Sequence, residues 1–584
     1  MKKIILIISL LIFNYPLIAQ WSNNPAVNNT ICDVDNAQLD PKISLASDGG
    51  CYMAWFDGRG DGELKVYIQR LDVNGVKQFG ENGLLVSDKP QNSWIGDWDL
   101  KTDASGNAIV VFSDKRASTG TDTTVNPYAY KISPTGTFLW GADGVALTSE
   151  TSRYQMWPKA AVLSDGSTAF VWWYFYPPTR TTWVKVQRLN SAGVPQYNPP
   201  VNIQSPDGKR YQYPNVVPSD NGSYIVSWVY GPKDTVGSFI PDNVSLMCNK
   251  YNSAGQPSLW AELPKIVYTN TGNTLPIYMV PQVIPDGMNG IIISYFHTGS
   301  STFFSSIQRY SSGGTQMFAN NGTLVATTTA RGHIQAAVTV STVTNDVYAF
   351  WTELDPPTTQ SHQAVYGQRI NNLGVRQWGD NGLAYTTLDT VGIFEIDCHA
   401  KDTNVVVTYM TEILGPQLDQ YRAFRVGQSG SKNWGNNGVS TVNSLKSYAN
   451  TVMNSSGMTM CVWQDSRNTH GGVFAQNVKY DGTLGPIGIK QISSNVPDRF
   501  NLMQNYPNPF NPMTKIKFDV SKTSFVTLNI YDNLGRFIKT IVSQNLSAGS
   551  YEADFNATGL ASGVYFYQLR TENFIQTKMM MLVK

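Results

Sequence analysis

The segment YIQRLDVNGVKQFGENG, residues 67–83, carries the pattern that decides the fold. A short strand-like run is followed by a turn that closes on Gly75, and then by an aromatic residue, Phe79, and two glycines. The Asn-Gly pair is typical of a tight hairpin turn between two strands. The segment therefore predicts two antiparallel strands, and an alternating run that ends on Trp55 predicts a third strand just before them.

The same order of strand, turn and aromatic residue recurs along the chain. Strand-end aromatic residues occur at Trp55, Phe112, Trp172, Trp228, Tyr295, Trp351, Tyr409 and Trp463, with a mean spacing of about 58 residues. The turn glycines keep the same phase, at Gly75, Gly136, Gly193, Gly255, Gly314, Gly374, Gly430 and Gly482. Two landmark series that stay in register through eight units indicate an internal repeat.

Two further pairs of residues mark fixed positions in the unit. Gln-Arg occurs at 69–70, 187–188, 308–309 and 368–369, and Trp-Gly occurs at 140–141, 378–379 and 434–435. Each unit holds three or four short strand-like runs, and we find no amphipathic helical segment of useful length. Units of four antiparallel strands at this spacing resemble the blades of a β-propeller, which bury their faces against one another.

We therefore expect an all-β protein with a β-propeller of eight blades. Seven blades, or two smaller propellers, are the alternatives. The segment Trp21–Pro25 resembles the element that begins at Trp434, so it is expected to add an outer strand to the last blade and close the ring. In this interpretation the repeated tryptophans fill the space between blades and do not bind a ligand.

Length, charge and cysteine usage limit the functional classes. With 584 residues the chain exceeds the size of one core, which predicts two or more domains or a repeat array. The net charge is +1 and Lys/Arg residues are not clustered, so no nucleic-acid partner is expected. The five cysteines, at 32, 51, 248, 398 and 461, form no disulfide framework, and we expect buried thiols, with a Cys32–Cys51 pair as the alternative.

The N-terminal residues have the pattern of a secretory signal peptide. Lys2 and Lys3 precede an apolar run over residues 4–13, and the small residue Ala19 ends the segment. The run is too short to span a bilayer, and no second long apolar stretch follows. We expect a signal peptide over residues 1–19, and no transmembrane segment in the mature protein.

The residues outside the repeat pattern are candidates for binding. Surplus aromatic residues lie in the loops that should open on one face of a propeller: Trp94, Trp98, Tyr154, Trp157, Tyr174, Tyr176, Tyr211 and Tyr213. Flat rings on a face built from loops stack on sugars or hold a peptide. The alternative is that these rings plug the channel and pack the loops.

An aromatic-x-Asp-x-Arg pattern places three carboxylates, Asp57, Asp114 and Asp465, in blades that become neighbours once the ring closes. They either offer carboxylates to a ligand or fix the start of a loop by charge-assisted hydrogen bonds to the arginines. The histidines show no paired spacing and the acidic segments match no full calcium loop, so no metal and no cofactor are expected. We recognise no catalytic motif, and any catalytic residues are unknown.

The segment that follows the repeat has a different pattern. Residues 496–584 hold six strand-like runs, which predict a small immunoglobulin-like β-sandwich. Before them lies QNYPNPFNP, residues 504–512, whose prolines cannot donate to a sheet and predict a stiff spacer.

This C-terminal segment resembles the type IX secretion C-terminal sorting domain of Bacteroidetes and related Gram-negative bacteria. The residues that carry the resemblance are Tyr506, Pro507, Asn508, Pro509, Phe510, Asn511, Pro512, Gly535, Gly549, Gly563 and Tyr565. The resemblance implies a β-sandwich that acts as the export signal across the outer membrane. It also implies that the type IX machinery is a partner, and that the domain is removed before surface attachment or release.

We predict three segments: a signal peptide at 1–19, a propeller at 20–495 and a sorting domain at 496–584. The predicted function is that of a secreted or cell-surface protein whose propeller binds an extracellular glycan or protein. A polysaccharide-active enzyme and a structural or adhesive surface protein are the alternatives, and the motifs favour a non-enzymatic role.

Overall fold

A computed structural model describes residues 21–583 of the protein. The description omits residues 92–96, 119–123, 152, 177–178, 180, 207, 232–244, 258–259, 261–263, 270–274, 276–279, 300, 414–417, 469, 487–488, 494 and 558–559. The predicted signal peptide at 1–19 therefore lies outside the described residues. The chain divides into two compact units, one built from Trp21–Asn74 with Gln78–Gly485 and one that contains Pro486–Lys584.

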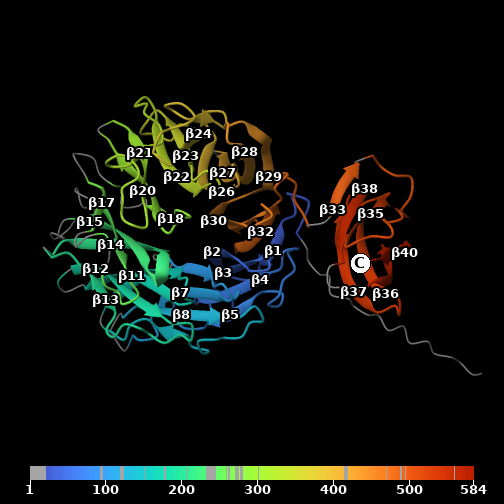
Figure 1. Ribbon diagram of the computed structural model, residues 1–584, viewed down its shortest axis with the longest axis horizontal. Helices are drawn as coiled ribbons and strands as arrows, with labels where there is room; N and C mark the ends of the chain where they lie inside the picture. The colour runs from blue at the N-terminus through green and yellow to red at the C-terminus, as the bar shows by residue number, and fades with distance from the viewer. Residues whose placement is uncertain are drawn as a thin grey trace, which may run out of the picture. The chain divides into compact units, whose positions relative to one another are not determined.

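The first unit is a β-propeller whose described residues form eight four-stranded antiparallel sheets (Figure 1). Blade 1 consists of β2 (Gln38–Leu45), β3 (Cys51–Asp57), β4 (Lys65–Leu71) and β5 (Leu84–Ser87), and blade 2 consists of β6 (Asp99–Thr102), β7 (Ala108–Asp114), β8 (Asn126–Ile132) and β9 (Val145–Ala146). Blade 3 consists of β10 (Tyr154–Val162), β11 (Thr168–Tyr176), β12 (Thr181–Leu189) and β13 (Val201–Ile203). Blade 4 consists of β14 (Arg210–Pro218), β15 (Tyr224–Gly231), β16 (Ser245–Tyr251) and β17 (Lys265–Tyr268). Blade 5 consists of β18 (Gln282–Pro285), β19 (Ile291–Thr298), β20 (Phe303–Tyr310) and β21 (Thr323–Leu324). Blade 6 consists of β22 (Gly332–Val340), β23 (Val347–Asp355), β24 (His362–Ile370) and β25 (Leu383–Ala384). Blade 7 consists of β26 (Gly392–Lys401), β27 (Asn404–Ile413), β28 (Leu418–Val426) and β29 (Lys432–Ser444). A short 3-10 turn, η2 (Asp220–Gly222), joins β14 to β15.

The eighth blade closes the ring with strands from both ends of the unit. It contains β30 (Lys446–Met453), β31 (Thr459–Asp465), β32 (Gly472–Val478) and, as its outer strand, β1 (Asn29–Cys32). Thr30 pairs with Phe474 in this closure. The expected all-β fold with eight blades is confirmed. The closing strand comes from the N-terminal segment as expected, but it is Asn29–Cys32 and not the predicted Trp21–Pro25, whose Trp21 donates to Val73 in blade 1.

The strand pairings show on which face of the propeller the chain crosses from one blade to the next. We call it the crossover face. In blade 1 the start of β2 pairs with the end of β3, the start of β4 pairs with that same end, and the end of β5 pairs with the start of β4. The crossovers between blades and the loops between second and third strands therefore open on this face. First strands of neighbouring blades contact each other, as β2 does with β6 and β30, so they surround the central channel.

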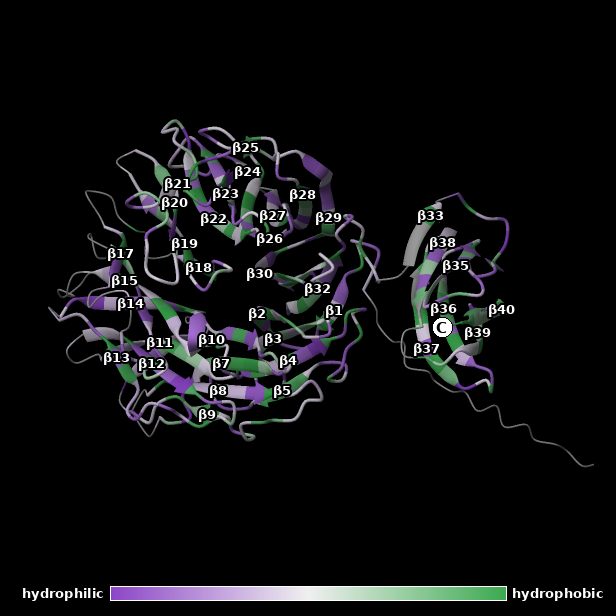
Figure 2. Cartoon of the chain, in the orientation of Figure 1, coloured by the Kyte–Doolittle hydropathy of each residue, from purple (hydrophilic) through white to green (hydrophobic). Residues whose placement is uncertain are grey.

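Hydrophobic side chains are buried between successive blades. Eight separate clusters of buried residues fill the eight interfaces, from blades 1 and 2 round to blades 8 and 1. Hydrophobic stretches run along inner strands such as β3 and β7 (Figure 2). All five cysteines are buried within this core and none forms a disulfide. The sequence prediction that the strand-end tryptophans pack between blades agrees with the zero exposure of Trp55, Trp172, Trp228, Trp351 and Trp463.

An aromatic residue between the third and fourth strands of each blade contacts the hairpin turn of the next blade. We call this contact the blade latch. Six of these residues also donate a hydrogen bond to the carbonyl two positions before the next turn glycine: Trp21 to Val73 (3.1 Å), Trp140 to Ser191 (3.2 Å), Tyr197 to Ser253 (3.0 Å), Trp260 to Ser312 (2.9 Å), Trp378 to Gln428 (3.0 Å) and Trp434 to Tyr480 (3.2 Å). Phe79 and Phe318 occupy the same position against Gly136 and Gly374 without a hydrogen bond.

The turn glycines at the latches of Trp140 and Trp260 have two physical reasons to lack a side chain. Gly314 has a φ of +79°, where residues with a Cβ are strained, and a Cβ there would lie 2.6 Å from Cδ1 of Trp260. Gly193 shows the same approach to Trp140. The aromatic ring therefore fits onto the next blade only because the turn carries a glycine.

The Gln-Arg pairs support the same hairpins. Gln368 donates to the carbonyl of Gly379 (2.7 Å) and accepts from the backbone N–H of Trp378 (2.8 Å), so it holds the latch residue in place. Arg369 pairs with Asp346 (3.1 Å) and donates to the carbonyl of Gln428 in the next blade (2.8 Å). Both residues of the motif are structural.

The second unit is a β-sandwich of two four-stranded sheets. One sheet has the order β33 (Ile489–Ser493), β38 (Gly549–Asn556), β35 (Met513–Val520) and β34 (Asn501–Leu502); the other has β37 (Phe537–Leu546), β36 (Ser524–Asp532), β39 (Gly563–Arg570) and β40 (Ile575–Leu582). The six predicted strands are present. One buried cluster, which includes Val526, Leu528 and Ile530, fills the space between the sheets.

The proline-rich segment at 504–512 is part of the sandwich, which corrects the prediction of a spacer. Asn505 is buried and its backbone N–H donates to the hydroxyl of Tyr567 (2.8 Å). Phe510 lies in the core, and its backbone exchanges hydrogen bonds with Met581 and Val583 at the last strand. Asn508 accepts from the N–H of Met581 (2.8 Å). The motif fixes the end of β40, a role that proline content alone does not indicate.

The latch yields a prediction in which two substitutions separate the ring from its hydrogen bond. Trp378→Ala should lower the free energy of unfolding by about 3–5 kcal/mol because it removes a buried ring. Trp378→Phe should cost about 1 kcal/mol, the net value of one hydrogen bond, since Phe79 and Phe318 serve the same position. Chemical denaturation of the full chain measures both. Equal losses for the two variants would contradict the assignment of most of the energy to the ring.

Candidate functional site

The first strand of six blades is interrupted by a bulge at the same place, near the crossover face. At each bulge one residue that is not glycine adopts a left-handed backbone: Asp40 (φ 46°), Trp157 (φ 60°), Tyr213 (φ 50°), Gln335 (φ 57°), Glu395 (φ 50°) and Tyr448 (φ 54°). The equivalent positions in blades 2 and 5 are Asp97 and Val280. We call these eight residues the bulge ring.

The bulge ring is unusual in the residue types that it holds in this conformation. The other left-handed residues that are not glycine, among those described, are Asn or Asp, which tolerate it best. Tryptophan, tyrosine and glutamate in this region each cost on the order of 1 kcal/mol or more, and such strain is retained where the surroundings or a function require it. Repetition in six blades shows that the bulge is a built feature of the repeat.

Members of the bulge ring are open to solvent although they lie on the innermost strands. Tyr448 is 48% exposed and Val280 is 38% exposed, and Gln335 is also exposed. Because first strands surround the channel and the bulges lie near the crossover ends of these strands, the bulge ring lies at the channel mouth. A cavity of about 180 Å³ is lined by Val280, Gln335 and Ile396, the residue after Glu395.

One sector of the ring is aromatic. The ring centroids of Trp157 and Tyr213 lie 5.0 Å apart, and both lie 5.7 Å from Trp173 at the end of β11. All three side chains are partly exposed. The indole N–H groups of Trp157 and Trp173 have no hydrogen-bond partner among the described residues. We call these three residues the aromatic cluster.

The neighbouring sector is charged. Nζ of Lys42 lies 3.1 Å from Oδ1 of Asp40 and 2.9 Å from Oδ1 of Asp97, and Lys159 also pairs with Asp97. Burial opposes ionisation of Asp97, but the ammonium groups of Lys159 and Lys42 lower its pKa below the usual value. Asp97 is therefore an ionised carboxylate shared by two lysines.

Glu395 behaves differently from Asp97. Burial raises the pKa of Glu395 to about 7, while the backbone N–H of Tyr448, 3.2 Å from Oε1, and the charge of Lys42 limit the rise. The carboxylate of Asp40 adds to it. One ring of residues thus holds a carboxyl that is protonated near neutral pH and carboxylates that lysines stabilise.

The structure places the predicted aromatic residues in three environments. Trp157 and Tyr213 belong to the aromatic cluster. Trp98 and Tyr211 are buried, the first donating to Oδ2 of Asp40 (2.8 Å) and the second packing on Trp228 at 5.2 Å. Trp94 lies outside the described residues.

The remaining predicted aromatic residues pack around Arg153 in blade 3. Tyr174 is stacked on Trp183 at 4.1 Å and accepts a hydrogen bond from Arg153, which also lies 3.8 Å above the ring of Tyr176. Tyr154 packs on Phe175. These rings pack the ends of β11 and β12 against the residues at the start of β10.

The three predicted aspartates are fully buried and bound by the arginines of their own motif. Oδ2 of Asp57 accepts from Arg59 (2.6 Å) and from the indole of Trp55 (2.7 Å), and Oδ2 of Asp114 accepts from Arg116 (2.6 Å). The arginines in turn lie over an aromatic ring, as Arg116 does over Tyr128 at 3.8 Å. Both carboxylate oxygens of Asp57 and of Asp114 accept hydrogen bonds from these arginines.

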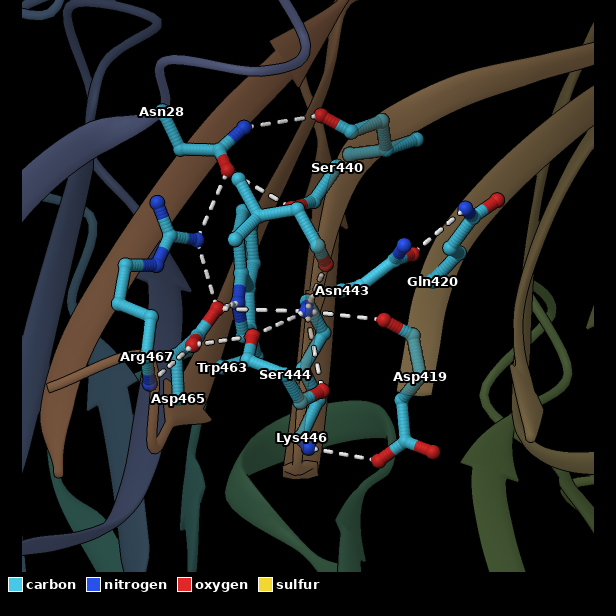
Figure 3. Close-up of polar contacts among 12 residues, drawn as sticks. Asn28, Asp419, Gln420, Ser440, Asn443, Ser444, Lys446, Trp463, Asp465 and Arg467 are labelled. Carbon is cyan, nitrogen blue, oxygen red and sulfur yellow. Dashed lines mark hydrogen bonds and ion pairs between the residues drawn. The ribbon is translucent and has the colours of Figure 1, made fainter. Parts of the chain in front are cut away.

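Asp465 has the largest network and lies where blade 7 meets the closing blade (Figure 3). It accepts from Trp463 (2.9 Å), Arg467 (2.6 Å) and Ser444 (2.6 Å) and lies 3.5 Å from Nζ of Lys446. Arg467 also donates to Asn28, just before β1. The network ties the N-terminal strand to blades 7 and 8.

Lys446 is the cation of this network and is completely buried. Nζ donates to the carbonyls of Val442 (2.6 Å) and Asp419 (3.0 Å) and to the hydroxyl of Ser444 (2.7 Å). Burial lowers the pKa of Lys446 to about 8, although Asp465 opposes the shift. Oxygen atoms surround the ammonium group, so its role is to hold the blade junction.

Sequence reasoning found part of the ring and missed the rest. Trp157 and Tyr213 were singled out as surplus aromatic residues, whereas Glu395, Asp40, Asp97 and Tyr448 were not. One sequence signal exists: a proline follows the bulge position in four blades, at 41, 158, 214 and 281. Proline within a strand marks an edge or a bulge.

The described residues were also searched for a membrane-spanning helix and for a metal site. In the part of the chain that is described, no helix is long and apolar enough to cross a membrane. Among the same residues, no group of three or more His, Cys, Asp or Glu side chains is placed to hold a metal ion.

Comparison with known proteins identifies the C-terminal unit. Residues 504–584 match the family described as the secretion system C-terminal sorting domain. No curated protein sequence matches the chain. The C-terminal unit is a type IX sorting domain, and the protein is exported to the cell surface or secreted.

Solved structures with a similar fold include an ulvan lyase, at 10% identity over 69% of this chain and 96% of that chain, with a TM-score of 0.42. An α-L-arabinofuranosidase of Fusarium graminearum bound to arabinobiose is similar at 11% identity over 56% and 94% of the two chains, with a TM-score of 0.33. PorZ, a surface component of the type IX secretion system of Porphyromonas gingivalis, aligns at 12% identity over 97% and 100%, with a TM-score of 0.19.

The network in Figure 3 predicts that Asp465 has a structural role. Asp465→Asn should lower the free energy of unfolding by about 3 kcal/mol because it leaves the buried Lys446 and Arg467 without their anion. Denaturant unfolding measures the loss. Asp380→Asn, which removes an exposed partner of Arg376, is the matched control and should change stability by about 1 kcal/mol or less. A variant as stable as the native protein would refute this role.

The sorting domain predicts the fate of a truncated chain. Removal of residues 505–584 should leave the propeller folded but retained in the periplasm, because the export signal is lost while the blade interfaces are intact. Immunoblotting of cell fractions, with circular dichroism of the retained protein, measures both. Truncated protein in the medium or on the cell surface would show that the domain is not the export signal.

Proposed function

We propose that the propeller of this exported protein binds an extracellular glycan at the channel mouth, on the aromatic cluster of Trp157, Trp173 and Tyr213. The observation that carries the proposal is the meeting of three partly exposed rings at the crossover face. None of the three takes part in a blade latch. The bulges that present Trp157 and Tyr213 hold these bulky residues in a strained left-handed conformation.

The chemistry of the cluster suits a sugar. A pyranose has a face of C–H groups edged by hydroxyls, so a flat aromatic ring covers the apolar face while neighbouring donors bind the oxygens. The indole nitrogens of Trp157 and Trp173 are buried and have no hydrogen-bond partner among the described residues, so the donors to the sugar hydroxyls come from other side chains. Gln335 and Tyr448 offer further polar groups around the same mouth.

A glycan fits this site better than a folded protein does. A stable protein interface covers about 800 Å² on each partner and would include the loops around the mouth. The aromatic cluster is a compact group of three side chains within the first two strands of blades 3 and 4. An elongated polymer reaches such a recessed site with one or two sugar units.

Affinity electrophoresis with xylan, arabinan, galactomannan, laminarin and alginate tests the proposal. The native protein should be retarded by at least one polymer, and Trp157→Ala and Tyr213→Ala should each weaken binding about ten-fold, or about 1.4 kcal/mol. Leu373→Ala, which truncates an exposed apolar residue on the opposite face, is the control and should bind as the native chain does.

Two outcomes would overturn the proposal. One is the absence of retardation by all five polymers. The other is unchanged retardation of Trp157→Ala and Tyr213→Ala, which would place any binding away from the cluster. Thermal unfolding of each variant confirms that the propeller is intact.

A further inference from the structure

We propose that Glu395 and Asp40, on either side of Tyr448 in the bulge ring, act as an acid–base pair that hydrolyses a glycosidic bond of the bound polysaccharide. This inference rests on the proposed glycan binding and adds a reaction to it. It concerns the charged sector of the ring, whereas binding was assigned to the aromatic sector.

The geometry places the two carboxyl groups at one mouth. Glu395, Tyr448 and Asp40 occupy the same bulge position in blades 7, 8 and 1, which are consecutive around the axis. Tyr448 is nearly half exposed between them, so it offers a surface on which a sugar unit lies with a carboxyl group on each side. The cavity next to Glu395, lined by Val280, Gln335 and Ile396, leaves room for part of the ligand.

Each carboxyl group is held in place by its neighbours. Oε1 of Glu395 accepts a hydrogen bond from the backbone N–H of Tyr448 (3.2 Å). Oδ2 of Asp40 accepts the indole N–H of Trp98 (2.8 Å), and Oδ1 pairs with Lys42 (3.1 Å). Trp98 is therefore a positioning residue for Asp40, and it explains one buried ring among the predicted candidates.

The surroundings of the proposed acid and of the proposed base differ. Burial raises the pKa of Glu395 to about 7, so this carboxyl retains a proton close to neutral pH. Lys42 lies 3.1 Å from Oδ1 of Asp40 and 2.9 Å from Oδ1 of Asp97; although burial opposes the charge of Lys42, the two carboxylates raise its pKa. Carboxyl groups whose environments differ in this sense are the arrangement that acid–base hydrolysis of glycosides uses.

The proposed step is a hydrolysis that consumes one water. Glu395 donates its proton to the glycosidic oxygen as the bond from that oxygen to the anomeric carbon breaks. Water adds its oxygen to the anomeric carbon, and Asp40 accepts the proton that the water loses. The products are two shorter sugars, and the proton returns from Asp40 to Glu395 through solvent. No oxidant or reductant is required.

Release of reducing ends from each polymer that retards the full chain tests the inference. The native protein should release them, and Glu395→Gln and Asp40→Asn should each reduce the rate at least about 100-fold while retardation in the gel persists. Glu63→Gln, a surface residue in the loop between β3 and β4, is the matched control and should leave the rate unchanged.

The pH profile supplies a readout that a purely structural role would not change. Because the acid acts in its protonated form, the rate should fall about ten-fold for each pH unit above about 7. Trp157→Ala should lose retardation and cleavage together. A chain that is retarded but releases no reducing ends would overturn the hydrolysis and leave the binding proposal standing. An unsaturated product, which marks elimination instead of hydrolysis, would overturn it as well.

Discussion

The contact of an aromatic ring with a glycine turn of the next blade is the constraint on which the propeller depends. A four-stranded sheet cannot bury both of its faces alone, so each blade gains a core only by packing against its neighbours. The latch sets the spacing and the angle of that packing at the outer edge, where the ring of Trp260 lies against Gly314 and donates to Ser312. A side chain on the turn would separate the two blades.

Closure of the ring uses the same contact. Trp21 donates to Val73 in blade 1 as the other latch residues do in their blades, although it belongs to the N-terminal segment. The strand β1 completes blade 8, and the network of Asp465, Arg467 and Lys446 ties this strand to blade 7. The charged groups of Asp465, Arg467 and Lys446 therefore form ion pairs with one another at the closure.

The functional proposals follow from the residues that the scaffold does not use. Repeated tryptophans, glutamines, arginines and turn glycines each have a defined contact between or within blades. The bulge ring shares its backbone shape among six blades but differs in side chain from blade to blade, from tryptophan to glutamate. A position whose geometry repeats while its chemistry varies gives the propeller an asymmetric mouth, aromatic on blades 3, 4 and 8 and charged on blades 7, 1 and 2.

Sequence reasoning predicted the scaffold because its rules are local. Turn glycines, tight turns and aromatic residues at a fixed distance can be recognised directly in the sequence, and their period gives eight blades. The sorting domain was recognised in the same way, from short motifs in order. Its proline-rich segment was predicted to be a spacer because prolines lack the N–H that a sheet needs. The fold shows that Asn508 and Phe510 bind the end of the last strand and that Asn505 binds Tyr567 in β39.

By itself the sequence determined the repeat, the blade count, the N-terminal origin of the closing strand and the export signal, since each depends on residues close together in the chain. Only the tertiary structure decided which side chains share the channel mouth. Glu395 and Asp40 are separated by most of the chain, and ring closure brings their blades to either side of blade 8. It also decided that Asp57, Asp114 and Asp465 are buried partners of arginines, because burial and pairing depend on neighbours that no local pattern contains.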